Sequence, residues 1–164
     1  GDATSLWHTV DPTYDEIIDA IDAFDFTGYE EFVFCGYGEP TCALEMLEKT
    51  AKYVKDKYHL PIRVNTNGLG NLYHGRDIVP ELAEYVDSVS ISLNAANAEE
   101  YNNVTRPSFD NAYEAMLDFA EECNRMIKHT QLSIVDVLPE EDIKTCQQIA
   151  DERGIHLKIR HFSN

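Results

Sequence analysis

Apolar residues recur along this chain at two alternating spacings, and each spacing predicts one kind of element. Spacing by three and four residues is typical of amphipathic helices, and it predicts helices at Thr13–Phe24, Ala43–Tyr58, Asp77–Val86, within Phe109–His129 and at Glu140–Arg153. Short apolar runs between them predict strands at Phe32–Cys35, Ile62–Asn65, Asp87–Ala95, Gln131–Val137 and Ile155–Phe162. The alternation predicts one α/β domain, residues 1–164, with a parallel sheet of about five strands and right-handed crossovers.

Several of the predicted strands carry polar residues on one face only. Successive side chains of a strand point to opposite faces, so the strand after Val86 has a polar face made of Ser88, Ser90, Ser92 and Asn94. The "IRVNTN" and "IHLKIR" segments alternate in the same way. A doubly wound sheet is buried on both faces and would show continuous apolar runs. We therefore expect a partial (β/α) barrel with helices on its outer face and a polar inner face that can hold a ligand. Edge strands that face water are the alternative.

The loop after the first predicted strand reads "GYGEPT", and its residues suit a ligand with a cationic amine. Ligands of parallel α/β proteins bind at the carboxyl ends of strands. Gly36 and Gly38 leave room for a ligand against the backbone, and Pro40 constrains Glu39 to an extended conformation. Backbone carbonyls and the Glu39 carboxylate can then converge on an ammonium group. A tight strand-to-helix turn with an exposed acid is the local alternative.

Charge and cysteine spacing exclude several classes of function. The formal net charge of -17 argues against a nucleic-acid partner. No apolar run reaches the ~20 residues of a membrane span, so no membrane partner is expected. The cysteines Cys35, Cys42, Cys123 and Cys146 have neither CxxC nor CxxxC spacing, so we expect no metal site, no disulfide and a cytoplasmic protein. A hydrolase that uses Cys35 or Cys42 as its nucleophile is one alternative.

The order of the segments "GYGEPT", "VNTNG", "SISLNA" and "SIVDVLPEED" resembles the radical S-adenosylmethionine (SAM) superfamily, and within it the TatD-linked radical SAM proteins. The likeness spans about Leu6 to Arg160 and implies the partial barrel of that superfamily. It also implies that the first segment binds the amino group of SAM through Gly36, Tyr37, Gly38 and Glu39. Further cofactor contacts are implied for Asn65, Asn67, Ser90, Ser92 and Asn94. Val137 and Leu138 are implied to lie near the adenine, and Arg106 either binds the SAM carboxylate or forms a surface ion pair.

One defining part of the superfamily is absent from this sequence. A CxxxCxxC motif normally provides three thiolates to a [4Fe–4S] cluster, and the chain lacks both this motif and a strand before its first helix. The resemblance therefore implies the C-terminal portion of a radical SAM enzyme without its first strand. The intact parent is expected to use SAM and a [4Fe–4S] cluster, while this chain alone is expected to bind neither and to be inactive. The sequence indicates no catalytic residue and no particular small-molecule substrate.

Two further expectations concern the partner of this chain and an alternative function. A missing first strand would leave the edge of the next strand unpaired, and an unpaired edge favours an edge-mediated homodimer. The second expectation concerns function of another class. A non-redox α/β module that binds a nucleoside or an amino acid at the same strand ends remains the alternative to a radical SAM enzyme.

Overall fold

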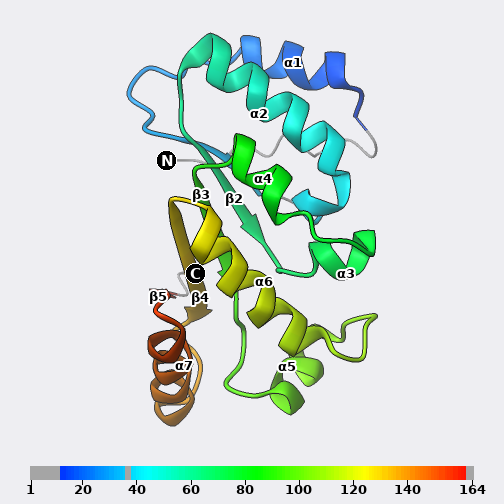
Figure 1. Cartoon of the computed structure of the whole chain (residues 1–164). Helices are drawn as coiled ribbons and strands as arrows, with labels where there is room; N and C mark the ends of the chain where they lie inside the picture. The colour runs from blue at the N-terminus through cyan, green and yellow to red at the C-terminus, as the bar shows by residue number, and fades with distance from the viewer. Residues whose placement is uncertain (1–11, 36–37, 162–164) are drawn as a thin grey trace.

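The computed structural model describes residues 12–35 and 38–161 of the chain. In chain order the elements are helix α1 (Tyr14–Asp22), strand β1 (Phe32–Phe34), the 3-10 helix η1 (Pro40–Ala43), α2 (Leu44–Tyr58), β2 (Ile62–Thr66), α3 (Gly70–His74), α4 (Val79–Tyr85), β3 (Ser88–Ser92), α5 (Ala98–Thr105), α6 (Ala112–Met126), β4 (His129–Val135), α7 (Glu140–Arg153) and β5 (His156–Arg160). The strands form one parallel sheet in the order β1-β2-β3-β4-β5 (Figure 1). Among the described residues, no helix has the length and apolar character needed to cross a bilayer.

Local sequence sets the ends of several helices. α1 begins with a capping box, in which the Glu16 amide donates to the Thr13 hydroxyl and the Thr13 amide donates to the Glu16 carboxylate, each at 3.2 Å. α7 ends where Gly154 adopts a left-handed backbone with a φ of 66°. Leu47 of α2 and Met116 of α6 are fully buried in the core that the helices form with the apolar face of the sheet.

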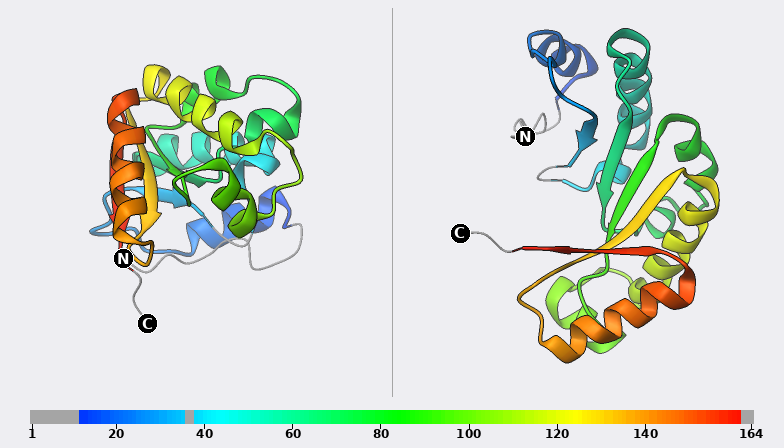
Figure 2. Two further views of the ribbon diagram at one scale, coloured as in Figure 1. Left: turned by 90° about the horizontal axis from the view of Figure 1, so that it is seen from below. Right: turned by 90° about the vertical axis from the view of Figure 1, so that its left-hand side faces the viewer.

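Each strand pairs with its neighbour in the chain, and this order decides where the helices lie. Right-handed crossovers between successive parallel strands all fall on the same side of the sheet. Helices α2, α4, α6 and α7 follow the outside of a sheet whose strands fan out from β1 to β5 (Figure 2). The expected α/β architecture, with parallel strands in one sheet and helices outside, is therefore confirmed.

The face of the sheet away from these helices carries rows of polar side chains. In one row the register aligns Asn65, Ser90, Gln131 and His156. The next row, toward the carboxyl ends of the strands, contains Ser92, Ser133 and Lys158. Within the first row, Gln131 Nε2 donates a hydrogen bond to Ser90 Oγ at 3.0 Å. The polar inner face predicted from the alternation is thus continuous across β2 to β5.

Two short helices and several element boundaries differ from the prediction made from the sequence. α3 and α5 lie where no element was predicted, because each buries only one residue, Gly70 and Tyr101 respectively, and so shows no helical period. The helix expected within Phe109–His129 ends at Met126, since Ile127 adopts an extended backbone (φ -113°, ψ 138°). The next strand consequently begins at His129, two residues earlier than predicted.

Candidate functional site

The Glu39 carboxylate joins the loop after β1 to the end of β2. Its Oε2 accepts hydrogen bonds from the Thr41 amide at 3.1 Å, from the Thr41 hydroxyl at 2.6 Å and from the Thr66 hydroxyl at 2.5 Å. Its Oε1 accepts from the Asn67 amide at 2.8 Å. Thr41 and Thr66 are 0% and 4% exposed, so water competes little for these bonds. The carboxylate is therefore held in one position at the carboxyl ends of two neighbouring strands.

This network still leaves Glu39 an acceptor position for a ligand. A carboxylate has about four lone-pair sites, and the three donors at Oε2 contrast with the single donor at Oε1. An ammonium group can therefore be accepted at Oε1. The sequence indicated Glu39 and Asn67 but not the two threonines that hold the carboxylate. Two features of the sequence could have identified these threonines. Thr41 comes directly after Pro40, Thr66 lies between the two asparagines of "NTNG", and each has a hydroxyl that can donate a hydrogen bond.

Glycines let the turn after β2 pack closely against its surroundings. A Cβ on Gly70 would lie 2.5 Å from Ile78 Cδ1 and 3.1 Å from Thr41 Oγ1. A Cβ on Gly68, whose φ is 77°, would lie 2.9 Å from Ile91 Cγ2. Any larger residue would displace these neighbours, and position 68 also needs a left-handed backbone. Both glycines therefore help to place the Thr41 hydroxyl and the "NTNG" turn.

A cavity of about 240 Å³ opens beside this network, and we call it the strand-end cavity. Its polar lining comes from Glu39, Asn67, Asn94 and Arg106, and its aromatic lining from Tyr73, Tyr101 and Phe109. Asn94 follows β3 with a φ of 68°. This left-handed conformation is uncommon outside glycine, and residues held in it cluster at binding sites. The aromatic residues belong to the unpredicted helices and to the loop after α5, so the sequence analysis did not identify them.

The strand-end cavity brings together three of the predicted site residues, Glu39, Asn67 and Asn94. Gly38 precedes Glu39 and is exposed, and a Cβ built there would meet nothing within 4 Å. The space that a glycine was expected to leave against the backbone is therefore open at this position. Gly36 and Tyr37 lie outside the described residues.

Arg106 also lines the strand-end cavity. It is exposed, and no ion pair to it is found within the described part of the chain. The alternative of a surface ion pair for Arg106 is therefore not supported by these residues. Its guanidinium is free to meet an anionic group of a ligand.

The other predicted site residues lie on the inner face of the sheet and not at the strand-end cavity. Asn65 accepts a hydrogen bond from Arg63 Nε at 3.3 Å. Ser90 is only 7% exposed and accepts from Gln131, while Ser92 is half-buried in the next row. Val137 and Leu138, which were expected near the adenine, do not line the cavity, and Val137 is 65% exposed.

Cys42 borders the strand-end cavity, but its thiol is not activated. Burial and the negative charge of Glu39 raise the pKa of the Cys42 thiol. A raised pKa opposes formation of the thiolate, which is the nucleophilic form. In residues 12–35 and 38–161, no group of three or more His, Cys, Asp or Glu side chains is placed to hold a metal ion. The described residues therefore support neither a cysteine nucleophile at Cys42 nor a set of cluster ligands.

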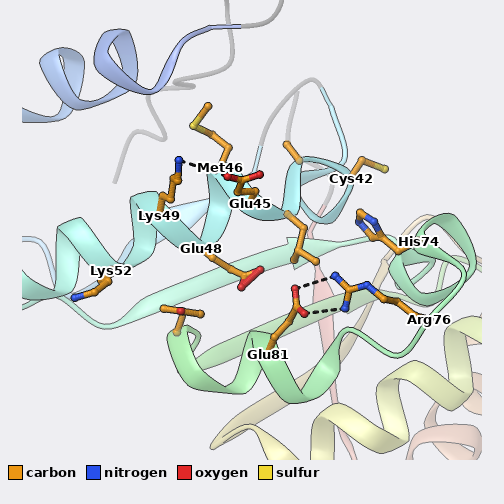
Figure 3. A pocket seen from close by; sticks show the side chains of 12 residues that line it. Cys42, Glu45, Met46, Glu48, Lys49, Lys52, His74, Arg76 and Glu81 are labelled. Carbon is orange, nitrogen blue, oxygen red and sulfur yellow. Dashed lines mark hydrogen bonds and ion pairs between the residues drawn. The ribbon is translucent and has the colours of Figure 1, made fainter.

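A larger groove of about 850 Å³ lies between α2 and α4 (Figure 3). On one wall Arg76 donates to both oxygens of Glu81, at 2.7 and 3.2 Å. On the other wall, burial and a hydrogen bond with Glu81 raise the pKa of the Glu48 carboxyl to about 7. The groove contains none of the predicted cofactor-binding residues, and its charged groups pair mostly with one another. We therefore place the functional site at the strand-end cavity despite its smaller volume.

Comparisons with known proteins agree with this architecture. No curated protein matches the sequence. Among solved structures, a domain of pyruvate-formate lyase-activating enzyme from Bacteroides vulgatus ATCC 8482 is similar in fold, with a TM-score of 0.50 at 16% identity over 79% of this chain and 98% of that chain. Residues 4–152 match the family model of the radical SAM superfamily. Because this match covers most of the sequence, the chain belongs to the radical SAM superfamily.

Proposed function

We propose that this chain supplies the SAM-binding part of a radical SAM enzyme, and that the strand-end cavity holds the methionine end of SAM. The observation that carries the proposal is the meeting of Glu39, Asn67 and Asn94 at the carboxyl ends of neighbouring strands. The cavity, at about 240 Å³, is smaller than the roughly 300–1,000 Å³ of sites for a whole drug-sized ligand. It therefore suits one end of the cofactor.

The donors and acceptors of the cavity match the two charges of an amino acid. Glu39 Oε1 is assigned to the ammonium group, together with the backbone of Gly36, Tyr37 and Gly38. Arg106 is assigned to the carboxylate, because a guanidinium binds carboxylates in a bidentate manner. Asn67 and Asn94 offer further amide groups. The inner-face residues Asn65, Ser90 and Ser92 are assigned to cofactor contacts beyond the cavity.

The same proposal places the cluster ligands outside this sequence. The cysteines Cys35, Cys42, Cys123 and Cys146 do not form a CxxxCxxC motif. When bound, SAM and a reduced [4Fe–4S] cluster supply a 5′-deoxyadenosyl radical that removes a hydrogen atom from the substrate. We therefore propose that a polypeptide segment carrying the motif completes the enzyme, and that this chain alone cleaves no SAM.

Two finer assignments belong to the same proposal. The order of the four motif segments supports the TatD-linked branch of the superfamily. The free state of Cys35, Cys42, Cys123 and Cys146 supports a reducing compartment, which we take to be the cytoplasm.

Anaerobic reconstitution with iron and sulfide tests whether the cluster ligands lie outside this sequence. We expect no stoichiometric [4Fe–4S] absorbance from the chain alone. When a natural upstream segment with three cysteines in CxxxCxxC spacing precedes it, we expect a cluster and formation of 5′-deoxyadenosine. In that longer protein, Glu39→Gln should weaken SAM binding about tenfold, which corresponds to ~1.4 kcal/mol. A stoichiometric cluster on the chain alone would contradict the proposal.

A non-redox module that binds a nucleoside or an amino acid is the second candidate function. The aromatic side chain of Tyr73 in the cavity lining favours it, since this ring is 57% exposed and can stack on a base. Calorimetry of the iron-free chain with SAM and S-adenosylhomocysteine separates the two candidates. Tight binding of either compound without iron supports the module, and negligible binding supports a cofactor site that needs the cluster.

A further inference from the structure

Seven of the thirteen lysines and arginines of this acidic chain form ion pairs, which lie on its helices and at the start of β2. Residues with a carboxylate within 4.0 Å are Lys49, Lys52, Lys55, Lys57, Arg63, Arg76 and Arg153. Lys158 and Arg160 on β5 have no such pair among the described residues, although acids outnumber bases 30 to 13 in the chain. β5 therefore carries two of the six basic residues that have no ion pair within the described part of the chain, and both are exposed.

Lys158 and Arg160 lie on the polar inner face of the sheet. The register pairs Lys158 with Ser133 and Arg160 with Val135, and Ser133 in turn pairs with Ser92. Because residues two apart share one face of a strand, both cations stand on the same side as Ser92. Their Cα atoms are roughly 6.6 Å apart at the usual rise along a strand. One small anionic group can therefore contact both side chains.

The two cations lie two strands away from the end of β3, where Asn94 lines the strand-end cavity. Lys158 is in the same row as Ser92, two strands away, which is about 10 Å at the usual strand spacing. Arg160 ends β5, at the carboxyl edge of the sheet where Asn94 follows β3. A molecule that lies beside the methionine end of SAM would reach β5 over this distance.

From this arrangement we infer that Lys158 and Arg160 bind an anionic group, a phosphate or a carboxylate, of the small-molecule substrate. The assignment of the anion to the substrate rests on the proposed function, while the anion site itself rests only on the geometry of β5. The planar guanidinium of Arg160 can donate two parallel hydrogen bonds to an oxyanion, and the ammonium group of Lys158 adds a second positive charge beside it. The net charge of -17 opposes long-range attraction of an anion. That opposition is screened beyond roughly 8 Å at physiological ionic strength, so we expect binding in the millimolar range.

Nuclear magnetic resonance of the whole chain tests the site without SAM or a cluster. Inorganic phosphate and, separately, succinate are titrated at pH 7.5, with sodium chloride at equal ionic strength as the reference. We expect backbone amide shifts concentrated in β5 and at the ends of β3 and β4, and the tighter ligand indicates whether phosphate or carboxylate is preferred. The double variant Lys158→Ala/Arg160→Ala should weaken binding at least tenfold.

A matched double variant keeps this test specific. Arg125→Ala/Lys144→Ala removes the same two charges from exposed positions of α6 and α7, and it should leave the affinity unchanged. Equal loss in both double variants, or no shifts in β5, would overturn the inference. Aggregation of the β5 variant with unchanged anion affinity would also overturn it, since the cations would then only protect a sheet edge. These results are independent of SAM cleavage by the assembled enzyme, so the inference and the proposed function can fail separately.

Discussion

At the level of single residues, the Glu39 carboxylate is both a structural acceptor and the proposed ligand of an ammonium group. Its four hydrogen bonds come from Thr41, Thr66 and the Asn67 amide. A substitution of Glu39 therefore removes a charge from the site and also releases the contact between two strand ends. Loss of function in such a variant has to be separated from loss of folding.

The structural part of this role predicts a loss of stability. Glu39→Ala leaves the Thr41 and Asn67 amides without their acceptor, and a buried donor without a partner costs about 1–3 kcal/mol. We expect the free energy of unfolding, measured with urea, to fall by roughly 2 kcal/mol. Glu45→Ala is the control, because Glu45 is 85% exposed in an ion pair with Lys49 that should contribute little. Equal stability of the two variants would show that the Glu39 network is not structural.

Two glycines of the site should differ in how much an added methyl group changes the stability of the protein. Gly38→Ala adds a Cβ that meets nothing within 4 Å, so stability should change by less than about 0.5 kcal/mol. SAM binding by the cluster-containing enzyme should nevertheless weaken, because the ligand is proposed to lie against this backbone. Gly70→Ala pushes against buried Ile78 and against Thr41, and overpacking of this kind costs about 1–3 kcal/mol. Thermal unfolding and SAM titration of both variants check the pair, and a destabilised Gly38→Ala variant would contradict it.

At the level of elements, α2 and α4 contain a pH-sensitive contact. The pKa of Glu48 is raised to about 7 by burial and by Glu81, which Arg76 keeps ionised by lowering its pKa. The folded state therefore holds the Glu48 proton more tightly than the unfolded state does. This contribution to stability is complete below pH ~4.5 and is lost as the pH rises through about 7.

Glu48→Gln should remove this pH dependence, because glutamine stays neutral. Relative to the unsubstituted chain, the variant should gain about 1 kcal/mol of stability between pH 5 and pH 8, which is less than the full shift implies because solvent screens the groove. Urea unfolding at both pH values measures the difference. Glu45→Gln, on the same helix, provides the comparison. A Glu48→Gln effect of equal size at both pH values would rule out the proton linkage.

The same elements show why sequence patterns identified part of the site and not all of it. The long helices and all five strands have clear apolar periods, so their order and the polar inner face could be predicted. Glu39 and Asn67 follow predicted strands, Asn94 lies near the end of one, and strand ends of a parallel sheet meet at one edge. Tyr73 and Tyr101 belong to α3 and α5, which bury too few residues to produce a pattern. Their place in the cavity depends on tertiary packing, which no local spacing reports.

At the level of the whole molecule, β1 is an edge of the sheet within the described residues, and we propose that it mediates a homodimer. The Phe32 amide donates to Pro61 of the segment before β2. Because successive amides of a strand point to opposite sides, the Val33 amide points away from β2. No acceptor for it is found among residues 12–35 and 38–161, so we take this donor to be available to a second chain.

Val33→Pro tests this edge without removing a bond to β2. Proline is tolerated on edge strands and has no amide proton. We expect light scattering to show a dimer for the unsubstituted chain and a monomer for the variant, with unchanged circular dichroism. A monomer before substitution would contradict the proposal, as would a dimer that survives it. A variant that fails to fold is identified by its circular dichroism, and Val33→Lys then serves as a milder change at the same edge.

The strand order has a consequence for how the protein is made. Each of the strands β2 to β5 pairs with the strand that precedes it in the chain, so each new unit docks on structure that already exists when it leaves the ribosome. Within the described part of the chain, each strand therefore has to wait only for the next strand, and not for one synthesised much later. Among the described strands, assembly can therefore proceed from β1 toward β5, and Lys158 and Arg160 are added after β1 to β4 are in place.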